Sequence, residues 1–230
     1  MIIAIDGPVA SGKGEMVKLL SEELDLETLD TGAIYRTITI AILEEKFDYN
    51  DNSKENLDKL NILLNSLDIR VETIKINGEK VQNYYLNGND VTKRIRDKET
   101  TKHVSFVSSN TTIRLFVTDF TREYAVGKNI IMDGRDIGTY VFPNADIKIF
   151  LTADPEIRAK RRFEQNKITK QNNMTFEEVL ENLKARDYND MYNKEIGALK
   201  QADDALLVDN TNQTEEETFK ILLDIIKSRM

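Results

Sequence analysis

The sequence contains no cysteine, and only one histidine and three prolines among its 230 residues. Without cysteine, a disulfide framework, a thiolate metal site and a cysteine nucleophile are all excluded. The single histidine, His103, stands in a polar stretch and has no second histidine with which to hold a zinc ion. We therefore predict no zinc site and no thiol chemistry, and the missing cysteines favour a reducing compartment.

Long apolar runs and an excess of positive charge are missing as well. The N-terminal apolar run reads MIIAI and stops at Asp6 without a preceding basic residue, so it resembles neither a secretory signal nor a membrane span. The net charge of -8 gives no long-range attraction to nucleic acid or to an anionic membrane, and aromatic residues are not interleaved with basic ones. We expect a cytoplasmic protein that binds neither nucleic acid nor a membrane.

In such an acidic chain, an anionic ligand must be held by local groups of basic residues. Arg158, Lys160, Arg161 and Arg162 form one such group. Taken alone, a charge run of this kind is more typical of a solvated helix face than of a binding surface. The three arginines are nevertheless spaced i, i+3 and i+4, which places them on one face of a helix.

Length and composition fit one globular domain with inserted subdomains, since 40% of the 230 residues are hydrophobic and 31% are charged. Short apolar runs alternate with helical patterns, which predicts an α/β fold with a parallel sheet flanked by helices. Five core strands are predicted, at residues 2–6, 28–30, 129–133, 146–151 and 205–209.

Local signals place an antiparallel insert and three helix starts. Between residues 67 and 90 the pattern changes to period-two runs around Asn77-Gly78, which predicts a hairpin. Helix starts are predicted at Asp154-Pro155, at Thr175 with Glu178, and at Thr214 with Glu217.

The most informative motif is GPVASGKG at residues 7 to 14, which fits the G-x-x-x-x-G-K part of a P-loop between a predicted strand and a predicted helix. Glycines let backbone N–H groups point at phosphates, the helix N-terminus adds positive potential, and Lys13 adds a point charge. We predict that ATP binds to Gly7, Pro8, Val9, Ala10, Ser11, Gly12, Lys13, Gly14 and Glu15.

The end of this motif separates kinases from other P-loop proteins. Gly14 stands where GTPases and motor ATPases carry the hydroxyl residue that holds magnesium, which favours a small-molecule kinase. A GTPase would also need N-K-x-D, whereas residues 166 to 169 read NKIT. A non-kinase P-loop ATPase stays open as the less favoured alternative. Glu15 is electrostatically unfavourable beside phosphates unless it faces solvent or the metal.

Two more polar segments follow predicted strands, DTGAIYR at residues 30 to 36 and GRDIGT at residues 134 to 139. Because the carboxyl ends of parallel strands meet at one edge of a sheet, these segments and the P-loop predict a ligand crevice. DTGAIYR alone is equally consistent with a structural turn. Asp133 has two interpretations, holding magnesium through water or ending a strand, and we assign no metal ligand from the sequence.

These blocks resemble, in order and over nearly the whole chain, the bacterial cytidylate (CMP) kinases. The resemblance rests on GPVASGKG, DTGAIYR, GRDIGT followed by VFPNADIKIFLTADPEIRAKRR, and KARDYND followed by LKQADDALLVDNT. It implies a P-loop kinase fold in a single nucleoside monophosphate kinase domain at residues 1–230. Within that domain it implies a monophosphate-binding part with the β insert at about 36–110 and a helical lid at about 158–173.

The implied activity is transfer of the γ-phosphoryl group from ATP, with Mg²⁺, to CMP or dCMP without a covalent enzyme intermediate, and we expect a monomer. Kinases acting on UMP, dTMP or shikimate are the alternatives within the enzyme class. The GRDIGT block with Ser105 and Arg114 favours cytosine. A carboxylate at Asp136 accepts a hydrogen bond from the N4 amino group of cytosine, whereas it would face the O4 acceptor of uracil.

The resemblance also implies roles for individual residues. Arg36 and Arg135 match positions on the acceptor phosphate, and Asp136, Ser105 and Arg114 match the cytosine-reading positions. Further acceptor contacts are assigned to Thr31, Tyr35, Arg186, Asp190 and Lys194. Arg158, Arg161 and Arg162 match lid arginines, and Lys13, Arg135, Arg158 and Arg162 are the expected catalytic residues.

One of these positions departs from the family pattern. Lys194, in MYNKEIGAL, stands near the place where the family carries an arginine. Lysine supplies one charge but lacks the planar fork of a guanidinium, which binds an acceptor phosphate through two parallel hydrogen bonds.

Overall fold

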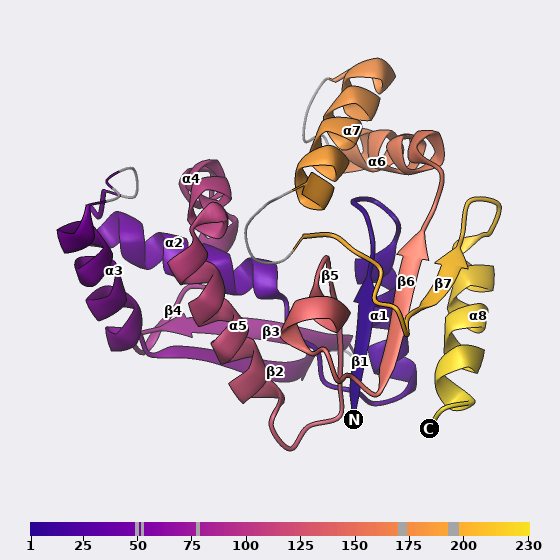
Figure 1. Cartoon of the computed structure of the whole chain (residues 1–230), viewed down its shortest axis with the longest axis horizontal. Coiled ribbons are helices and arrows are strands. Elements are labelled where there is room, and N and C mark those ends of the chain that lie inside the picture. Colours follow the sequence, from indigo (N-terminus) through magenta and orange to yellow (C-terminus); the bar gives the residue numbers. More distant parts are fainter. Residues whose placement is uncertain (49–50, 52, 77–78, 170–173, 193–197) are drawn as a thin grey trace. The chain divides into compact units, whose positions relative to one another are not determined.

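The computed structural model describes residues 1–48, 51, 53–76, 79–169, 174–192 and 198–230. They form two compact units (Figure 1). Unit 1 consists of Met1–Leu29 together with Ala125–Met230, and unit 2 is Asp30–Tyr124. Within the described ranges, none of the helices combines the length and the apolar composition that a membrane crossing requires.

Unit 1 is built on a parallel sheet, as the alternation of strands and helices predicts. Its strands are β1 (Ile2–Asp6), β5 (Ile130–Gly134), β6 (Ile147–Thr152) and β7 (Leu206–Asp209), in the order β5-β1-β6-β7 (Figure 1). β1 pairs in parallel with β5 on one side and with β6 on the other. The carboxyl ends of these strands therefore lie along one edge, where the P-loop and GRDIGT segments begin.

The described part of the sheet has four strands, so the predicted count of five is not confirmed. Near the predicted strand at residues 28–30 the chain makes a single parallel bridge, between Glu27 and Ile130. The side chain of Asp30 already caps the next helix by accepting a hydrogen bond from the N–H of Ala33 at 3.1 Å. The run is too short for a ladder because the helix begins directly after it.

Two helices of unit 1 pack on the same face of this sheet. They are α1 (Lys13–Glu23) and α8 (Glu215–Lys227), and Figure 1 shows α8 beside β7. Leu20 of α1 and Leu222 of α8 are fully buried with Ile5 of the central strand. Packing of this kind holds the first turn of α1, and with it the P-loop, firmly against the end of β1.

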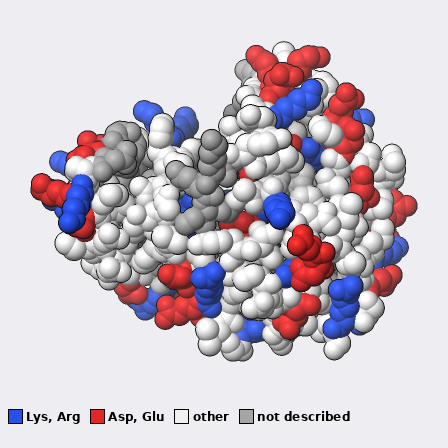
Figure 2. All heavy atoms as spheres, viewed as in Figure 1, with Lys and Arg blue, Asp and Glu red and all other residues white. Residues whose placement is uncertain are grey.

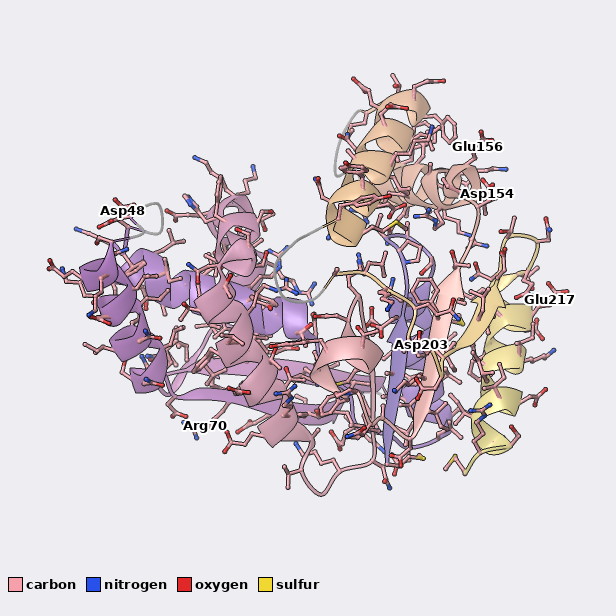
Figure 3. All side chains as sticks on the ribbon, in the orientation of Figure 1. Asp48, Arg70, Asp154, Glu156, Asp203 and Glu217 are labelled. Carbon is pink, nitrogen blue, oxygen red and sulfur yellow. The ribbon has the colours of Figure 1, made fainter. Side chains whose placement is uncertain are left out.

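Two further α-helices of unit 1 are α6 (Pro155–Thr169) and α7 (Phe176–Tyr192). As predicted, α6 begins at its proline, and the carboxylate of Asp154 accepts a hydrogen bond from the N–H of Glu156 at 2.8 Å (Figure 3). A small core that includes Ala159 joins α6 to α7.

The other two predicted helix starts are also confirmed. Before α7, the Thr175 hydroxyl accepts from the N–H of Glu178 at 3.2 Å, and the Glu178 carboxylate accepts from the N–H of Thr175 at 2.8 Å. Thr214 and Glu217 form the same reciprocal pair before α8. These local capping signals therefore fix three of the helix starts of unit 1.

Unit 2 contains helices and the predicted antiparallel insert. Its elements are α2 (Thr31–Glu44), α3 (Lys54–Ser66), β2 (Ile69–Ile76), β3 (Glu79–Leu86), β4 (Asn89–Asp90), η1 (Arg94–Arg96), α4 (Lys98–Ser109) and α5 (Thr111–Ala125), whose last residue belongs to unit 1. The insert is an antiparallel sheet in the order β2-β3-β4. The predicted Asn77-Gly78 turn lies outside the described residues.

Candidate functional site

The loop between β1 and α1 has the backbone that a phosphate cradle needs. A Cβ atom on Gly7 would lie 2.0 Å from the carbonyl oxygen of Leu151, so only glycine allows the loop to lie this close to β6. Gly12, with φ of +93°, turns the chain into the first turn of α1. The N-terminus of α1 therefore faces the loop, which favours binding of an anion there.

Lys13, the first residue of α1, folds back over this loop. Its side chain is 4% exposed, and Nζ donates to the carbonyl oxygen of Pro8 at 2.7 Å and to Oγ of Ser11 at 3.3 Å. The pKa of Lys13 is lowered to about 7, mainly by burial and also by the nearby positive charge of Arg135, against the opposing effect of Asp133. The cradle therefore holds an amine that titrates near neutral pH.

At pH 8 we expect ATP binding to be accompanied by proton uptake at Lys13. A pKa of about 7 leaves this amine mostly neutral in the free protein, and bound phosphates stabilise its ammonium form. Calorimetric titrations in buffers of different ionisation enthalpy measure the uptake, and Lys13→Met should remove it. The hypothesis is contradicted if the unsubstituted protein takes up no proton.

The lowered pKa of Lys13 also makes the stability of the fold depend on pH. Between pH 7 and the ordinary lysine pKa of 10.5, the unfolded chain binds more protons at Lys13 than the folded protein. The contribution of this group to the free energy of unfolding therefore rises with pH across that window.

The exposure of Glu15 reduces the electrostatic repulsion expected between its carboxylate and bound phosphates. Glu15 and Gly14 are both exposed in the first turn of α1. A carboxylate surrounded by water interacts only weakly with a charge several ångströms away. In this exposed setting the Glu15 carboxylate is compatible with phosphates bound at the loop.

The GRDIGT segment follows β5 and carries Arg135 and Asp136. After Asp136 the chain forms one turn of π-helix, η2 (Ile137–Val141), in which the Asp136 carbonyl accepts from the N–H of Tyr140 at 2.8 Å. Arg135 Nε donates to the Asp190 carboxylate at 2.7 Å, and both side chains are about one-quarter exposed, at 24% and 25%. The structure thus brings together two predicted site residues from segments far apart in the chain.

Positive and negative charges are mixed on the surface, so the role of each arginine must be judged from its own burial and contacts. Figure 2 shows basic and acidic side chains interspersed on the face in view. The predicted lid arginines of α6 differ strongly in their burial, although they share a helix.

Arg158 is buried, at 4% exposure, so a solvated helix face is the wrong interpretation for this residue. It donates to the carbonyl oxygens of Ala153 at 2.9 Å and Val9 at 3.0 Å. It also forms an ion pair with Asp187 of α7 at 2.7 Å. Arg158 therefore connects the P-loop with both α6 and α7.

Arg161 reaches the P-loop through a second residue, Asn210. Its guanidinium donates to Oδ1 of Asn210 at 3.0 Å and to the Asn210 carbonyl at 2.8 Å, while Nδ2 of Asn210 donates to the carbonyl of Ser11 at 3.0 Å. Partial burial lowers the pKa of Arg161 from its ordinary value. Arg162, by contrast, is exposed and donates to Gln165 at 2.9 Å.

An open depression of about 620 Å³ lies at the ends of β6 and β7, lined by residues 152–154, 209 and 211–213. Its size falls in the range of small-ligand sites. Sequence reasoning missed Asn210 and this depression. The signal was available, since Asn210 directly follows the predicted strand at residues 205–209, at the same edge as the P-loop.

Unit 2 holds five of the other predicted residues, and three of these, Thr31, Tyr35 and Arg36, are on α2. The carboxylate of Asp30 caps this helix, which confirms a structural role for the start of DTGAIYR. Arg36 donates to the carbonyl of Ile95 at 3.2 Å and to the hydroxyl of Thr101 at 2.9 Å.

Two other predicted base-reading residues lie on consecutive helices of unit 2. Ser105 is exposed on α4, and Arg114 of α5 is partly buried. Arg114 donates to the carbonyl of Ser108 at 3.4 Å, and the Ser108 hydroxyl donates to the carbonyl of Ser105 at 3.2 Å. The structure therefore links these two residues within unit 2 through Ser108.

The last predicted residues belong to α7 and to the chain after it. Arg186 is exposed on α7, whereas Lys194 lies outside the described residues. Among the side chains that the structure describes, no cluster of three or more metal-binding types could hold a metal ion.

Comparison with known proteins gives one consistent result. A family model described as cytidylate kinase matches residues 3–228. The cytidylate kinase of Leuconostoc mesenteroides is 40% identical over 228 residues, which cover 99% of this chain and 97% of that protein. The cytidylate kinase of Bacillus licheniformis is 41% identical over 229 residues, covering 100% and 97%.

A comparison of solved structures supports the fold alone. An uncharacterized protein from Eubacterium ventriosum matches with a TM-score of 0.51 at 15% identity, and the match covers 100% of this chain and 99% of that protein.

Proposed function

Because this chain belongs to the cytidylate kinase family, we propose that it transfers the γ-phosphoryl group of ATP to CMP, giving ADP and CDP. We propose dCMP as a second acceptor. The observation that supports this most directly is the buried Lys13 amine inside a glycine loop, with Arg135 near enough to lower its pKa. Such a loop binds a triphosphate, and an adjacent arginine suits a second phosphate.

The donor nucleotide is proposed to bind entirely within unit 1. Backbone N–H groups of residues 7–14 and the Lys13 ammonium would hold the β- and γ-phosphates. The depression lined by residues 152–154, 209 and 211–213 would take the adenosine part, because Asn210 connects it to the P-loop. Arg161 lies beside both and would contact the donor nucleotide.

Magnesium fits this site as a partner of ATP. The protein groups available to it are few, and Asp133, whose charge acts on Lys13, would meet it through water. When bound, the ion neutralises charge on the β- and γ-phosphates.

Roles on the acceptor nucleotide are proposed separately for the residues of unit 1 and for those of unit 2. In unit 1, Arg135 would bind the acceptor phosphate, Asp136 the cytosine, and Arg186 and Asp190 the ribose. In unit 2, Arg36 would bind phosphate, Ser105 and Arg114 the base, and Thr31 and Tyr35 would add contacts. Lys194 is proposed as a further phosphate ligand.

The chemistry is proposed to be direct in-line transfer. The acceptor phosphate oxygen attacks the γ-phosphorus as the bond to the β-phosphate oxygen breaks, and positive charges stabilise the transferring group. Lys13, Arg135, Arg158 and Arg162 would supply these charges. Arg158 would first have to release Val9 and Asp187, to which it is bonded here.

We further propose that residues 1–230 act as one nucleoside monophosphate kinase domain with the P-loop kinase fold. Unit 2 would contain the monophosphate-binding part, at about 36–110, and α6 would provide most of a helical lid at about 158–173. A monomer in the cytoplasm is the proposed working form.

The proposal is tested by measuring ADP release with a panel of acceptors in a coupled assay. CMP and dCMP should give the highest kcat/KM, with UMP, dTMP and shikimate far below. ADP release that does not depend on an acceptor would instead favour a non-kinase ATPase. A clear preference for one of the other acceptors would overturn the choice of cytidine nucleotides.

Asp136→Ala should lose preference for cytosine before it loses activity. One good carboxylate contact to the N4 amino group distinguishes the bases by about 1 to 3 kcal/mol, which corresponds to roughly 5- to 150-fold in the CMP to UMP ratio of kcat/KM. Asp203→Ala, an exposed carboxylate in the loop before β7 (Figure 3), is the matched control. An unchanged ratio in Asp136→Ala would show that another residue reads the base.

A further inference from the structure

Asp6 is a buried carboxylate to which none of the roles above is assigned. It ends β1, one residue before the P-loop, and is 5% exposed. Oδ1 accepts from the N–H of Ile137 at 2.9 Å, and Oδ2 accepts from the N–H of Gly138 at 2.7 Å. Two charge-assisted bonds to a single turn, across more than 130 positions of sequence, make a strong and specific tie.

These bonds complete a clamp around the dipeptide Arg135-Asp136. On its N-terminal side, the backbone of Asp6 pairs with Gly134 in the β1–β5 register. On its C-terminal side, the Asp6 side chain holds Ile137 and Gly138, whose N–H groups begin the η2 turn and have no carbonyl of that turn to bind. One residue thus fixes the chain both before and after the dipeptide.

The turn also packs tightly over this carboxylate. A Cβ atom added to Gly138 would lie 3.3 Å from Oδ2 of Asp6 and 3.2 Å from Cδ of Lys148. A Cβ atom on Gly134 would lie 2.6 Å from Cγ1 of Ile137. Because the turn is packed this tightly, a shift of the Asp6 side chain must shift the turn or the side chains that pack against it.

The same residue begins the P-loop, because Gly7 follows it directly. Its backbone is held between β5 and β6 in the middle of the sheet. The loop that carries Lys13 and the turn that follows Asp136 are therefore both anchored to a single residue.

We propose that Asp6 is a positioning residue that holds Arg135 and Asp136 at a fixed place relative to the P-loop, so that an acceptor nucleotide meets both groups in the right geometry. The proposal rests on the proposed kinase function. Asp6 itself touches no substrate in this scheme and acts only through the backbone of the turn.

Asp6→Asn is the direct test, because the amide keeps the size of the side chain but turns an NH₂ group toward one of the two N–H donors. The turn must then shift, and displacement of a positioning group by about 1 Å can lower a rate by roughly 100-fold. We expect kcat/KM for CMP to fall by about that factor and the CMP to UMP ratio to fall as well. The KM for ATP should change little.

Gly138→Ala changes the other partner of the same contact. It therefore tests the proposal even if the Asp6→Asn protein fails to fold. Its added methyl group would press against Oδ2 of Asp6, so the KM for CMP should rise with the KM for ATP retained. Asp146→Asn is the matched control, because its carboxylate accepts from the N–H of Ile2 at 2.6 Å at the opposite end of β1. It should leave both KM values unchanged.

The outcomes separate the two hypotheses. Loss of CMP affinity and base preference in both test variants, with ATP binding retained, supports the positioning role. Equal loss for ATP and CMP, or unchanged CMP kinetics in Asp6→Asn and Gly138→Ala, overturns it and leaves the kinase function standing. An unsubstituted protein that releases no ADP with CMP overturns both.

Discussion

Lys13→Met is expected to abolish phosphoryl transfer and to leave the fold intact. The ammonium group is held inside the P-loop by Pro8 and Ser11, where it would meet the phosphates of ATP. Removing one preorganised charge of this kind lowers kcat by about 100- to 1,000-fold. Methionine fills a similar volume and removes a buried amine whose charging is unfavourable, so the melting temperature should be retained.

The measurement combines a coupled ADP-release assay with thermal unfolding. Lys18→Met is the matched control, since Lys18 is exposed on the same helix, and it should keep full activity. If Lys13→Met retained activity within about threefold of the unsubstituted protein, a loss far below the expected 100-fold, the loop would not be the phosphate site.

Arg135→Lys is expected to lose nearly as much activity as Arg135→Ala. A guanidinium can bind a phosphate through two parallel hydrogen bonds while Nε keeps its bond to Asp190, whereas an ammonium offers one point charge. We expect kcat/KM for CMP to fall by about 100-fold or more in both variants. The KM for ATP should change less, because the donor contacts lie in other segments.

Arg122→Ala is the control for loss of an arginine from an ion pair. Arg122 pairs with Asp119 at 3.5 Å on the surface of α5, and exposed pairs contribute little to stability. Steady-state kinetics with CMP varied at saturating ATP measures the effect. Restoration of full activity by lysine at position 135 would show that charge alone is needed there.

The sequence predicts well the features that depend on neighbouring residues. The helix starts before α6, α7 and α8 follow from an Asp-Pro pair and from two capping pairs three positions apart, and each is present. The loop around Lys13 is likewise predictable, because glycines and a helix N-terminus determine its conformation locally. The antiparallel pairing of β2 with β3 follows from period-two patterns on either side of a turn signal.

Features that depend on distant residues were not predictable in the same way. Helical spacing places Arg158 and Arg162 on one face, but the first is buried against Val9 and Asp187 while the second is in solvent. The π-turn after Asp136 is held by a carboxylate from β1, a contact that no local pattern encodes. The sequence at residues 28–30 has the composition of a strand. Asp30 nevertheless caps the following helix, and the chain forms only the single bridge between Glu27 and Ile130 in the described structure.

Arg158, a residue of α6, connects the P-loop to α6 and α7 through a hydrogen bond and an ion pair. Its guanidinium is bonded at the same time to the Val9 carbonyl and to the carboxylate of Asp187. We therefore expect any change in the shape of the loop on nucleotide binding to change the contact between Arg158 and α7. Thermodynamic reciprocity then requires that whatever stabilises one arrangement of α6 and α7 alters nucleotide affinity by the same factor. Nucleotide binding at residues 7–14 would in this way be coupled to the arrangement of α6 and α7.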